Sequence, residues 1–298
     1  MKKIINRVII ICLLLSSCDN EEVKPVYDPL TFDGVELLCE VLPSGTYNAI
    51  QSTSLNIAYT ITNNGKIFKT EDGGDTWKQQ DSGTELPLYE IFFLDDLNGY
   101  ITGFDGVTNE GIILRTTNGG ETWLPQIFQT QIHSIYFIES LTGFATGQKL
   151  YKTINGGETW SEIDLEHHVY SSINFYNDKK TGFLIAGNLT TGFKLLKTTD
   201  GGNSWIAIDN NWGNSTIKRV QILDNIDIAF VSSQGGKIFK TRNRGSSWQT
   251  IDSSFSGHFI NERQAVGVGQ FWYEQGYFPD GIIHSTTDGG KHWDVKHY

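Results

Sequence analysis

The stretch Thr70-Glu71-Asp72-Gly73-Gly74-Asp75-Thr76-Trp77 decides the fold, because its pattern occurs six times along the chain without a gap. The other copies begin at Thr116, Thr153, Thr198, Thr241 and Thr286. All share the pattern Thr-x-[Asp/Asn]-x-Gly-x-[Thr/Ser]-Trp, except that His292 replaces the hydroxyl residue in the last copy. Successive tryptophans of these copies are 46, 37, 45, 43 and 45 residues apart, which is the spacing of a repeat protein. We call each copy a box.

The residue types of the box predict a tight turn. The Asp or Asn side chain can accept hydrogen bonds from N–H groups of its own turn, and the glycine at the fifth position tolerates a positive φ. Arg244 replaces the glycine at the fourth position of the fifth box, which a turn can accommodate. The tryptophan brings apolar area to a thin sheet. The structural box residues are Asp72, Trp77, Asn118, Trp123, Asn155, Trp160, Asp200, Trp205, Asn243, Trp248, Asp288 and Trp293.

A calcium site in the boxes is not expected. Calcium binding requires several carboxylates around one ion, whereas each box has few, and some boxes carry an Asn at the central position, such as Asn118 and Asn155. We therefore predict no metal site and no cofactor.

Each box closes a unit that reads as four short strands. In the third unit, residues 132–138 and 142–147 are apolar or Gly-aromatic segments, residues 149–153 alternate, and the box tryptophan opens a fourth segment. Four strands in about 40 residues are typical of a β-propeller blade. The units span residues 44–80, 86–126, 130–164, 168–209, 214–252 and 255–298. The prediction is an all-β, six-bladed β-propeller of four-stranded antiparallel blades, with residues 35–42 as one extra strand.

The box resembles the Asp-box, or BNR repeat, of sialidases and many other propellers. The wider pattern, with its Gly-aromatic second strand, is similar to the BNR-like propeller of photosystem II stability/assembly factors, over residues 44–298. That family has seven blades, so a seven-bladed propeller is the alternative. The resemblance implies a scaffold that holds a membrane-protein precursor, but a fold alone does not define a function.

The first 17 residues are predicted to be a signal peptide, because a basic start precedes a short apolar run. The segment Leu15-Ser16-Ser17-Cys18 resembles the bacterial lipobox, in which the cysteine is acylated. An ordinary signal peptide with an incidental cysteine is the alternative. Residues 18–30 would form an acidic tether, whose start is similar to the surface-export signal of Bacteroidetes-type lipoproteins. We expect residues 31–298, the propeller, to be lipid-anchored in the cell envelope, at the outer membrane and exposed at the surface.

The charge of the chain excludes some partners. The formal net charge is -11, and cleavage after residue 17 would make it -14, because three basic residues are lost. Nucleic-acid binding requires a basic surface and is therefore not expected. Membrane contact would come through the lipid anchor only. Cys39 would be the one cysteine of the propeller, so no internal disulfide is possible, and we expect a monomer with a buried Cys39.

The candidate ligand residues lie on one predicted face. Alternate turns of a meander lie at opposite ends of its strands, so the second-to-third-strand loops and the blade connections share a face opposite the boxes. We call it the variable face. Trp212 and Trp272, the two tryptophans outside the boxes, both map there. The candidate residues are Phe104, His168, Tyr170, Trp212, Trp272, Tyr273 and Tyr277. They would form a recognition surface for a protein or a sugar, or a loop that packs on itself over the channel.

An enzyme is the second class of function. The sialidase resemblance implies three converging arginines, but the mature chain has only Arg115, Arg219, Arg242, Arg244 and Arg263. Arg242 and Arg244 lie in a box turn, on the wrong face. The sequence thus favours a non-catalytic scaffold that binds an envelope protein or a glycan. A sialidase-like glycoside hydrolase, which would need two carboxylates, or a polysaccharide lyase is the alternative.

Overall fold

The computed structural model describes residues 42, 46–165, 167, 169–188, 192–208, 212, 216–223, 227–233, 237–251, 258–259, 261–269, 272–273, 276–277, 282–288, 291–292 and 294–297. Several predictions fall outside the described residues. They concern residues 1–17, 18–30 and 35–41, and with them Cys18, Cys39, His168 and Trp293. Of the expected extra strand at 35–42, only Leu42 is described. Every regular element in the described part is a β-strand. The described part of the chain contains no helix that is long and apolar enough to cross a membrane.

The strands form four-stranded sheets in chain order, and we call each such sheet a blade. Blade one has β1 (Tyr47–Ser52), β2 (Ala58–Thr62), β3 (Ile67–Thr70) and β4 (Lys78–Gln80). Blade two has β5 (Leu88–Phe93), β6 (Gly99–Phe104), β7 (Gly111–Thr116) and β8 (Leu124–Phe128). Blade three has β9 (Ile132–Phe137), β10 (Gly143–Gly147), β11 (Leu150–Thr153) and β12 (Ser161–Ile163).

The second half of the chain repeats this arrangement. Blade four has β13 (Val169–Phe175), β14 (Gly182–Asn188), β15 (Gly192–Thr198) and β16 (Ile206–Ala207). Blade five has β17 (Ile217–Ile222), β18 (Ala229–Ser233), β19 (Ile238–Thr241) and β20 (Gln249–Ile251). Blade six has β21 (His258–Phe259), β22 (Ala265–Gly269), β25 (Ile282–Thr286) and β26 (Asp294–His297), with β23 (Trp272–Tyr273) and β24 (Gly276–Tyr277) as a separate pair.

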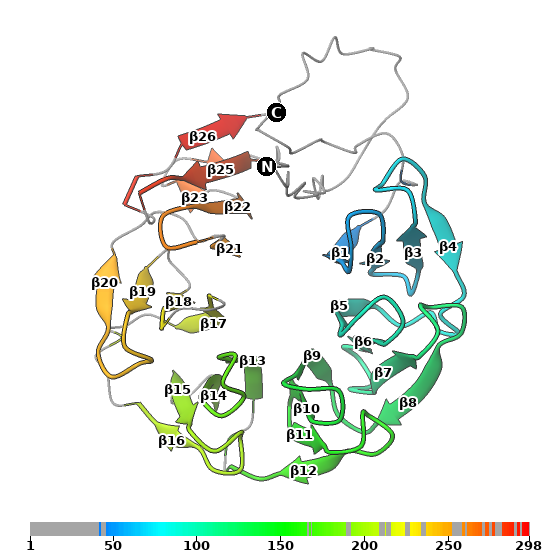
Figure 1. Cartoon of the computed structure of the whole chain (residues 1–298), viewed down its shortest axis with the longest axis horizontal. Helices are drawn as coiled ribbons and strands as arrows, with labels where there is room; N and C mark the ends of the chain where they lie inside the picture. Colours follow the sequence, from blue (N-terminus) through cyan, green and yellow to red (C-terminus); the bar gives the residue numbers. More distant parts are fainter. Residues whose placement is uncertain are drawn as a thin grey trace, which may run out of the picture. The chain divides into compact units, whose positions relative to one another are not determined.

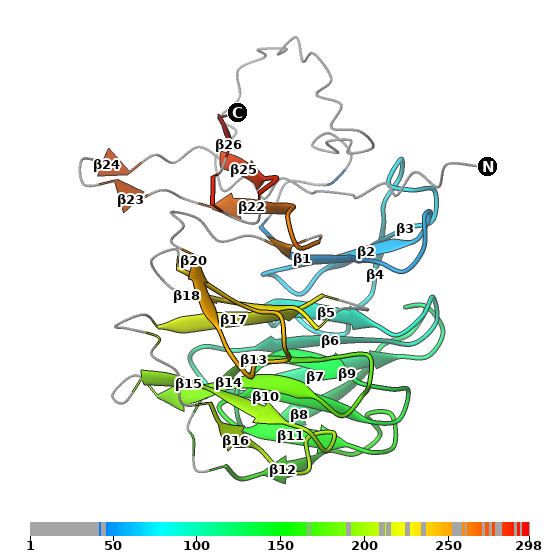
Figure 2. The same ribbon diagram turned by 60° about the vertical axis from the view of Figure 1, so that its left-hand side comes forward.

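The described strands thus give one four-stranded blade for each box, as the repeat predicts (Figure 1). In every blade the third strand ends at the threonine that opens the box. Figure 2 shows β13, β14 and β15 side by side, each antiparallel to the next. The chain divides into two compact units: residues 1–103, 113–126 and 270–281 form the first, and residues 104–112, 127–269 and 282–298 form the second.

A buried threonine organises each box turn. In the third box, Thr153 Oγ1 donates to Asn155 Oδ1 at 2.9 Å and accepts from the Gly157 N–H at 2.9 Å. Asn155 Oδ1 also accepts from the Thr159 N–H at 3.0 Å. The first, second, fourth and fifth boxes repeat these three bonds. The predicted turn, with the central Asp or Asn accepting N–H groups, is therefore present in them.

The hydroxyl at the seventh box position explains why either Asp or Asn can occupy the central position. Where the central residue is Asp, its second oxygen accepts the hydroxyl proton, as in Asp200 and Ser204 at 2.6 Å. Where it is Asn, its amide donates to the hydroxyl oxygen, as in Asn155 and Thr159 at 2.9 Å. A hydroxyl can donate or accept, so both residues complete the turn. In the sixth box the His292 ring nitrogen lies 2.5 Å from a carboxylate oxygen of the central Asp.

Aromatic rings join neighbouring blades of the second unit. Phe144, on the second strand of blade three, stacks on Phe175 of blade four with ring centroids 5.4 Å apart. The box tryptophan of blade four, Trp205, meets both rings at their edges. Lys152 places its ammonium 5.4 Å from the Phe144 ring and donates to Asn203 in the box of blade four. These contacts exclude water between the blades and add cation–π attraction to apolar burial.

The glycine before this aromatic position is required by a close approach. A Cβ on Gly143 would lie 2.6 Å from the ring of Phe137, and a Cβ on Gly182 would lie 2.5 Å from the ring of Phe175. Each phenylalanine ends the first strand of the same blade. The Gly-aromatic pattern of the second strand therefore lets one ring pack under the strand while the next side chain packs on the neighbouring blade.

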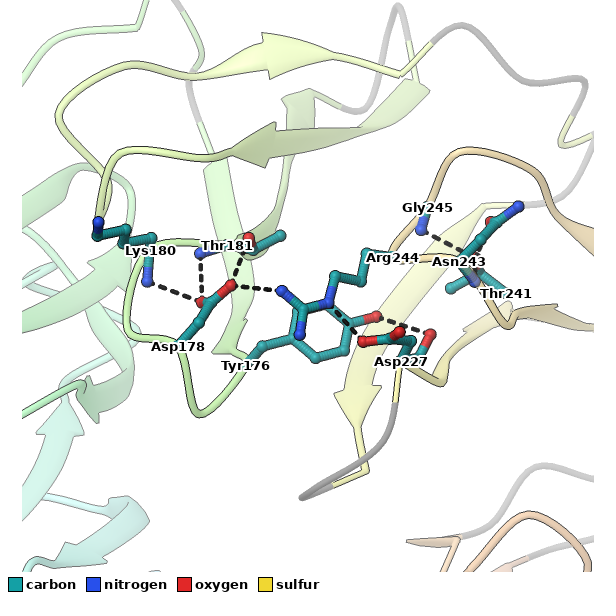
Figure 3. A network of polar contacts seen from close by, with 9 residues as sticks. All are labelled: Tyr176, Asp178, Lys180, Thr181, Asp227, Thr241, Asn243, Arg244 and Gly245. Atoms are coloured by element: carbon teal, nitrogen blue, oxygen red, sulfur yellow. Dashed lines mark hydrogen bonds and ion pairs between the residues drawn. The ribbon is translucent and has the colours of Figure 1, made fainter.

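Arg244 departs from the box pattern and is held by ionic contacts (Figure 3). Its φ is +54°, in the left-handed region where side chains other than glycine are strained. Its guanidinium lies 2.6 Å from an Asp178 oxygen and 2.5 Å from an Asp227 oxygen, and it covers the ring of Tyr176 at 5.1 Å. Asp178 belongs to blade four and Asp227 to blade five, so Arg244 links the two turns beside its own box.

The first prediction concerns the pH dependence of the box. Hydrogen bonds from the Ser204 hydroxyl and N–H lower the pKa of Asp200 to about 2. A lowered folded-state pKa gives stability that is present above the unfolded pKa of about 4 and is lost as the pH falls toward 2. We expect Asp200→Asn to match the wild type at neutral pH, because other boxes use Asn, and to lose less stability between these pH values. Urea unfolding at a series of pH values measures this. Parallel profiles for the two proteins would contradict it.

The second prediction separates strain from attraction at Arg244. Arg244→Ala keeps the strained backbone but loses the ionic contacts. Arg244→Gly also loses the ionic contacts, but it relieves the backbone strain. We expect the glycine variant to be about 1 kcal/mol more stable than the alanine variant. In 1 M salt, exposed ion pairs are screened within about 3 Å. We therefore expect the difference in unfolding free energy between the wild type and Arg244→Gly to be smaller in 1 M salt. Urea unfolding gives both values. Equal stabilities of the two variants would show that the backbone is not strained.

Candidate functional site

A β-bulge recurs near the start of the first strand in five blades. The register with the second strand shifts by one residue, so that one residue of the first strand has no partner opposite it. This end of the strand follows the blade connection and therefore lies on the variable face. Bulges re-aim side chains and often lie beside functional sites. The five bulge residues are Asn48, Tyr89, His133, Ser171 and Lys218.

The bulge residues differ, whereas their neighbours in the scaffold are alike. The residue before each bulge is a buried apolar or aromatic one. These neighbours are Tyr47, Leu88, Ile132, Tyr170 and Ile217. The repeat thus fixes one register position by packing and leaves the next position open to an amide, a phenol, an imidazole, a hydroxyl or an ammonium. This is the arrangement expected of a binding surface built on a repeated scaffold.

In the first unit, the bulge residues are Asn48 and Tyr89. The Asn48 amide donates to the carbonyl oxygen of Leu88 at 2.6 Å, which ties the first strands of blades one and two together. Tyr89 is 37% exposed. The amide of Gln51 further strengthens this link, because it donates to the Phe93 carbonyl and accepts from the Phe93 N–H.

In the second unit, His133 and Lys218 both meet aromatic rings. His133 lies against Phe104, one of the predicted ligand-face residues, with ring centroids 4.8 Å apart. Burial lowers the pKa of His133, so the imidazole is neutral near pH 7. Lys218 is exposed and places its ammonium 5.8 Å from the ring of Phe193. Two different kinds of contact, one neutral and one cationic, therefore occur at the same register position.

Two predicted ligand-face residues instead pack in the interior of the second unit. Tyr170 is 2% exposed and belongs to the core of blades three and four, where burial raises the pKa of its phenol. Its ring therefore lies in the core and not on the predicted ligand face. Trp212 is partly buried and meets Phe239 and Trp248 edge-on, with centroids 4.9 Å and 5.6 Å away. The apolar cluster beside the fifth box explains why a connection residue turns inward.

The aromatic insertion of blade six forms a short hairpin. Trp272 pairs with Tyr277 and Tyr273 with Gly276 across β23 and β24. These strands belong to the first unit, whereas Trp212 belongs to the second. His168, the remaining candidate, lies outside the described residues.

Sequence reasoning missed the bulge residues. The sequence does contain a signal. A residue with a polar group follows the first apolar or aromatic residue of these first strands, as in Ile132-His133 and Ile217-Lys218. In the portion of the chain with described positions, no three His, Cys, Asp or Glu side chains are grouped to bind a metal ion.

Comparison with known proteins identifies similar propellers. Residues 126–271 match the family model described as Photosynthesis system II assembly factor YCF48. The structure is similar to YCF48 from Cyanidioschyzon merolae, with a TM-score of 0.62, 16% identity and 84% of each chain covered. A structure of YCF48 bound to D1 peptide gives 0.59 and 17%, covering 86% of this chain and 82% of that one. No curated protein matches the sequence.

A glycoside hydrolase has the same kind of fold. The GH74 enzyme of Niastella koreensis gives a TM-score of 0.62 at 15% identity, over 86% of this chain and 46% of that enzyme. This chain therefore spans less than half of the enzyme. Identities this low show the fold alone. Together the blades and these similarities confirm the predicted fold class, an all-β propeller of four-stranded antiparallel blades. The number of blades in the closed ring stays a prediction.

The third prediction tests whether Trp212 is a core residue. Its edge-on contacts should make Trp212→Ala lose about 3 kcal/mol of unfolding free energy, whereas Trp212→Phe, which keeps a ring there, should lose less than about 1.5 kcal/mol. Urea unfolding of the two variants measures this. A change near zero for the alanine variant would return Trp212 to the list of exposed recognition residues.

Proposed function

We propose that the chain is a non-catalytic propeller that binds a protein or peptide partner on its variable face, as a scaffold or assembly factor. The observation that carries this proposal is the set of five bulges, which place five chemically different side chains at one register of a repeated scaffold. Recognition requires such local differences, whereas a purely structural propeller would repeat this position as it repeats the box. An envelope glycan is the alternative partner.

The similar proteins support a protein partner. The matching family model describes an assembly factor, and one structure of comparable fold is a complex with D1 peptide. The first strands that the structure describes carry one acidic residue, Glu90. Glycoside hydrolysis generally uses two carboxylates that flank the scissile bond. The first strands alone therefore do not supply the pair that the sialidase-like alternative would need.

The N-terminal sequence supports an anchored location. We propose that Cys18 is lipidated, that residues 18–30 tether the propeller, and that it acts at the outer membrane of the cell envelope. More than one acyl chain on one residue gives stable anchoring. Labelled palmitate should be incorporated by the wild type and not by Cys18→Ala. Label retained by the variant would remove the lipid anchor.

The fourth prediction tests binding directly. The full-length chain is panned against random peptides displayed on phage and is applied to a glycan array. We expect peptides to be enriched, and we expect Lys218→Ala to weaken their binding about tenfold, because it removes a bulge side chain of the second unit. Gln249→Ala is the matched control, since Gln249 is exposed on β20, outside the variable face.

The outcomes separate the alternatives. Peptide binding that is equal in all variants would place the binding site away from the bulges. Binding to glycans without peptide enrichment would favour the glycan partner. Turnover of xyloglucan or of a sialyl substrate by the purified chain would show that the protein is an enzyme.

A further inference from the structure

Three carboxamides of the second unit form a chain of hydrogen bonds on the variable face. Asn109 Oδ1 accepts from Gln131 Nε2 at 2.8 Å and from Gln148 Nε2 at 3.2 Å. Gln131 Oε1 lies 3.1 Å from His133 Nε2. These residues come from the β6–β7 loop, the connection before β9, the first strand of blade three and the β10–β11 turn. We call Asn109, Gln131, His133 and Gln148 the carboxamide cluster.

Two glycines allow this cluster to assemble. A Cβ on Gly111 would lie 2.2 Å from the Thr130 carbonyl oxygen, and a Cβ on Gly147 would lie 1.9 Å from the Gln131 carbonyl oxygen. Both hairpins can therefore approach the connection that carries Gln131. Asn109 itself has a φ of +62°, in the left-handed region that asparagine tolerates better than most residues. The cluster is thus built by the backbone and is not a chance contact of flexible side chains.

The cluster is electrically neutral. Gln131 donates through its nitrogen to Asn109, so its oxygen faces His133, and His133 must donate from Nε2. Burial lowers the pKa of His133, which keeps the ring neutral. Two acids of blades two and three are engaged elsewhere. Asp105 accepts from the N–H of Val107, and Glu162 pairs with Lys149 at 2.6 Å. A charged ligand would find no counter-ion in the cluster itself.

The internal bonds leave one amide nitrogen and one amide oxygen of the cluster without a partner among the residues that the structure describes. Asn109 Oδ1 already accepts two bonds, which fills its lone pairs. Within the described residues, the Asn109 amide nitrogen and Gln148 Oε1 have no protein partner. The hydrogen bond between the two amides joins the side chains that carry this nitrogen and this oxygen. An extended peptide presents a carbonyl oxygen and an N–H on the same edge, which match such a pair.

We propose that the carboxamide cluster is a subsite that binds the backbone of an extended, uncharged peptide segment, with Asn109 donating to its carbonyl and Gln148 accepting from its N–H. The inference rests on the proposed function and names its partner class and contact point. A sugar ring fits less well, because sugars stack on open aromatic faces. The ring of Phe104 already lies against His133, and the ring of Phe128 meets Tyr151 with centroids 5.1 Å apart.

The fifth prediction uses peptides selected by panning on the full-length wild type. Asn109→Gly suits the left-handed backbone while it removes the amide, and Gln148→Ala removes the acceptor. We expect each variant to bind the selected peptides about tenfold more weakly, and N-methylation of the contacted peptide amide to have a similar effect on the wild type. Gln249→Ala, with an exposed glutamine on β20, should bind as the wild type does. Urea unfolding confirms that the variants are folded.

Each outcome decides the proposal. Loss of binding in both folded variants and with the N-methylated peptide supports it. Peptides that bind the wild type and both variants equally overturn the subsite but leave the proposed function standing. Glycan binding that is lost in Asn109→Gly, without any peptide binding, overturns the peptide class in favour of a sugar. Absence of any peptide or glycan binding to the wild type overturns the proposed function and this subsite together.

Discussion

The buried hydroxyl of the box threonine is the interaction on which the rest of the structure depends. In all six boxes this residue is 1–2% exposed, and its oxygen donates to the central Asp or Asn. The same oxygen accepts the N–H of the fifth residue in the five boxes where that residue is described. A buried N–H without a partner costs about 1–3 kcal/mol, so this bond stabilises the closed turn. In the five boxes with a described tryptophan, that closure places the tryptophan directly before the fourth strand.

The fixed box turn positions the contacts between blades. In the second unit, Trp205 meets Phe144 of the preceding blade, and Trp248 meets Phe183 in the same manner. Arg244 shows how far the turn can vary. It occupies a glycine position at positive φ, and its guanidinium bonds to Asp178 and Asp227 offset that strain. The box end is thus held by repeated contacts, while the opposite end of the strands can differ from blade to blade.

Two of the aromatic residues predicted for the ligand face pack inward instead. Tyr170 and Trp212 stand outside the box pattern, yet both rings pack into apolar gaps of the second unit. A large ring gains most by burial, so an aromatic side chain in a connection turns inward wherever a gap exists. A charged side chain cannot gain in this way. Lys218 is exposed at its bulge, whereas Trp212 packs inward.

The sequence by itself determined the boxes, the four strands of each blade and the propeller class. The box turns depend on hydrogen bonds within a few residues, and the blades follow from a repeat that can be recognised in the sequence. Only the tertiary structure decided the bulges, the inward turn of Trp212 and the carboxamide cluster. Asn109 meets Gln131 across 22 residues and Gln148 across 39. Such contacts depend on how closely two backbones approach, and here that distance is set by Gly111 and Gly147, whose significance no local pattern shows.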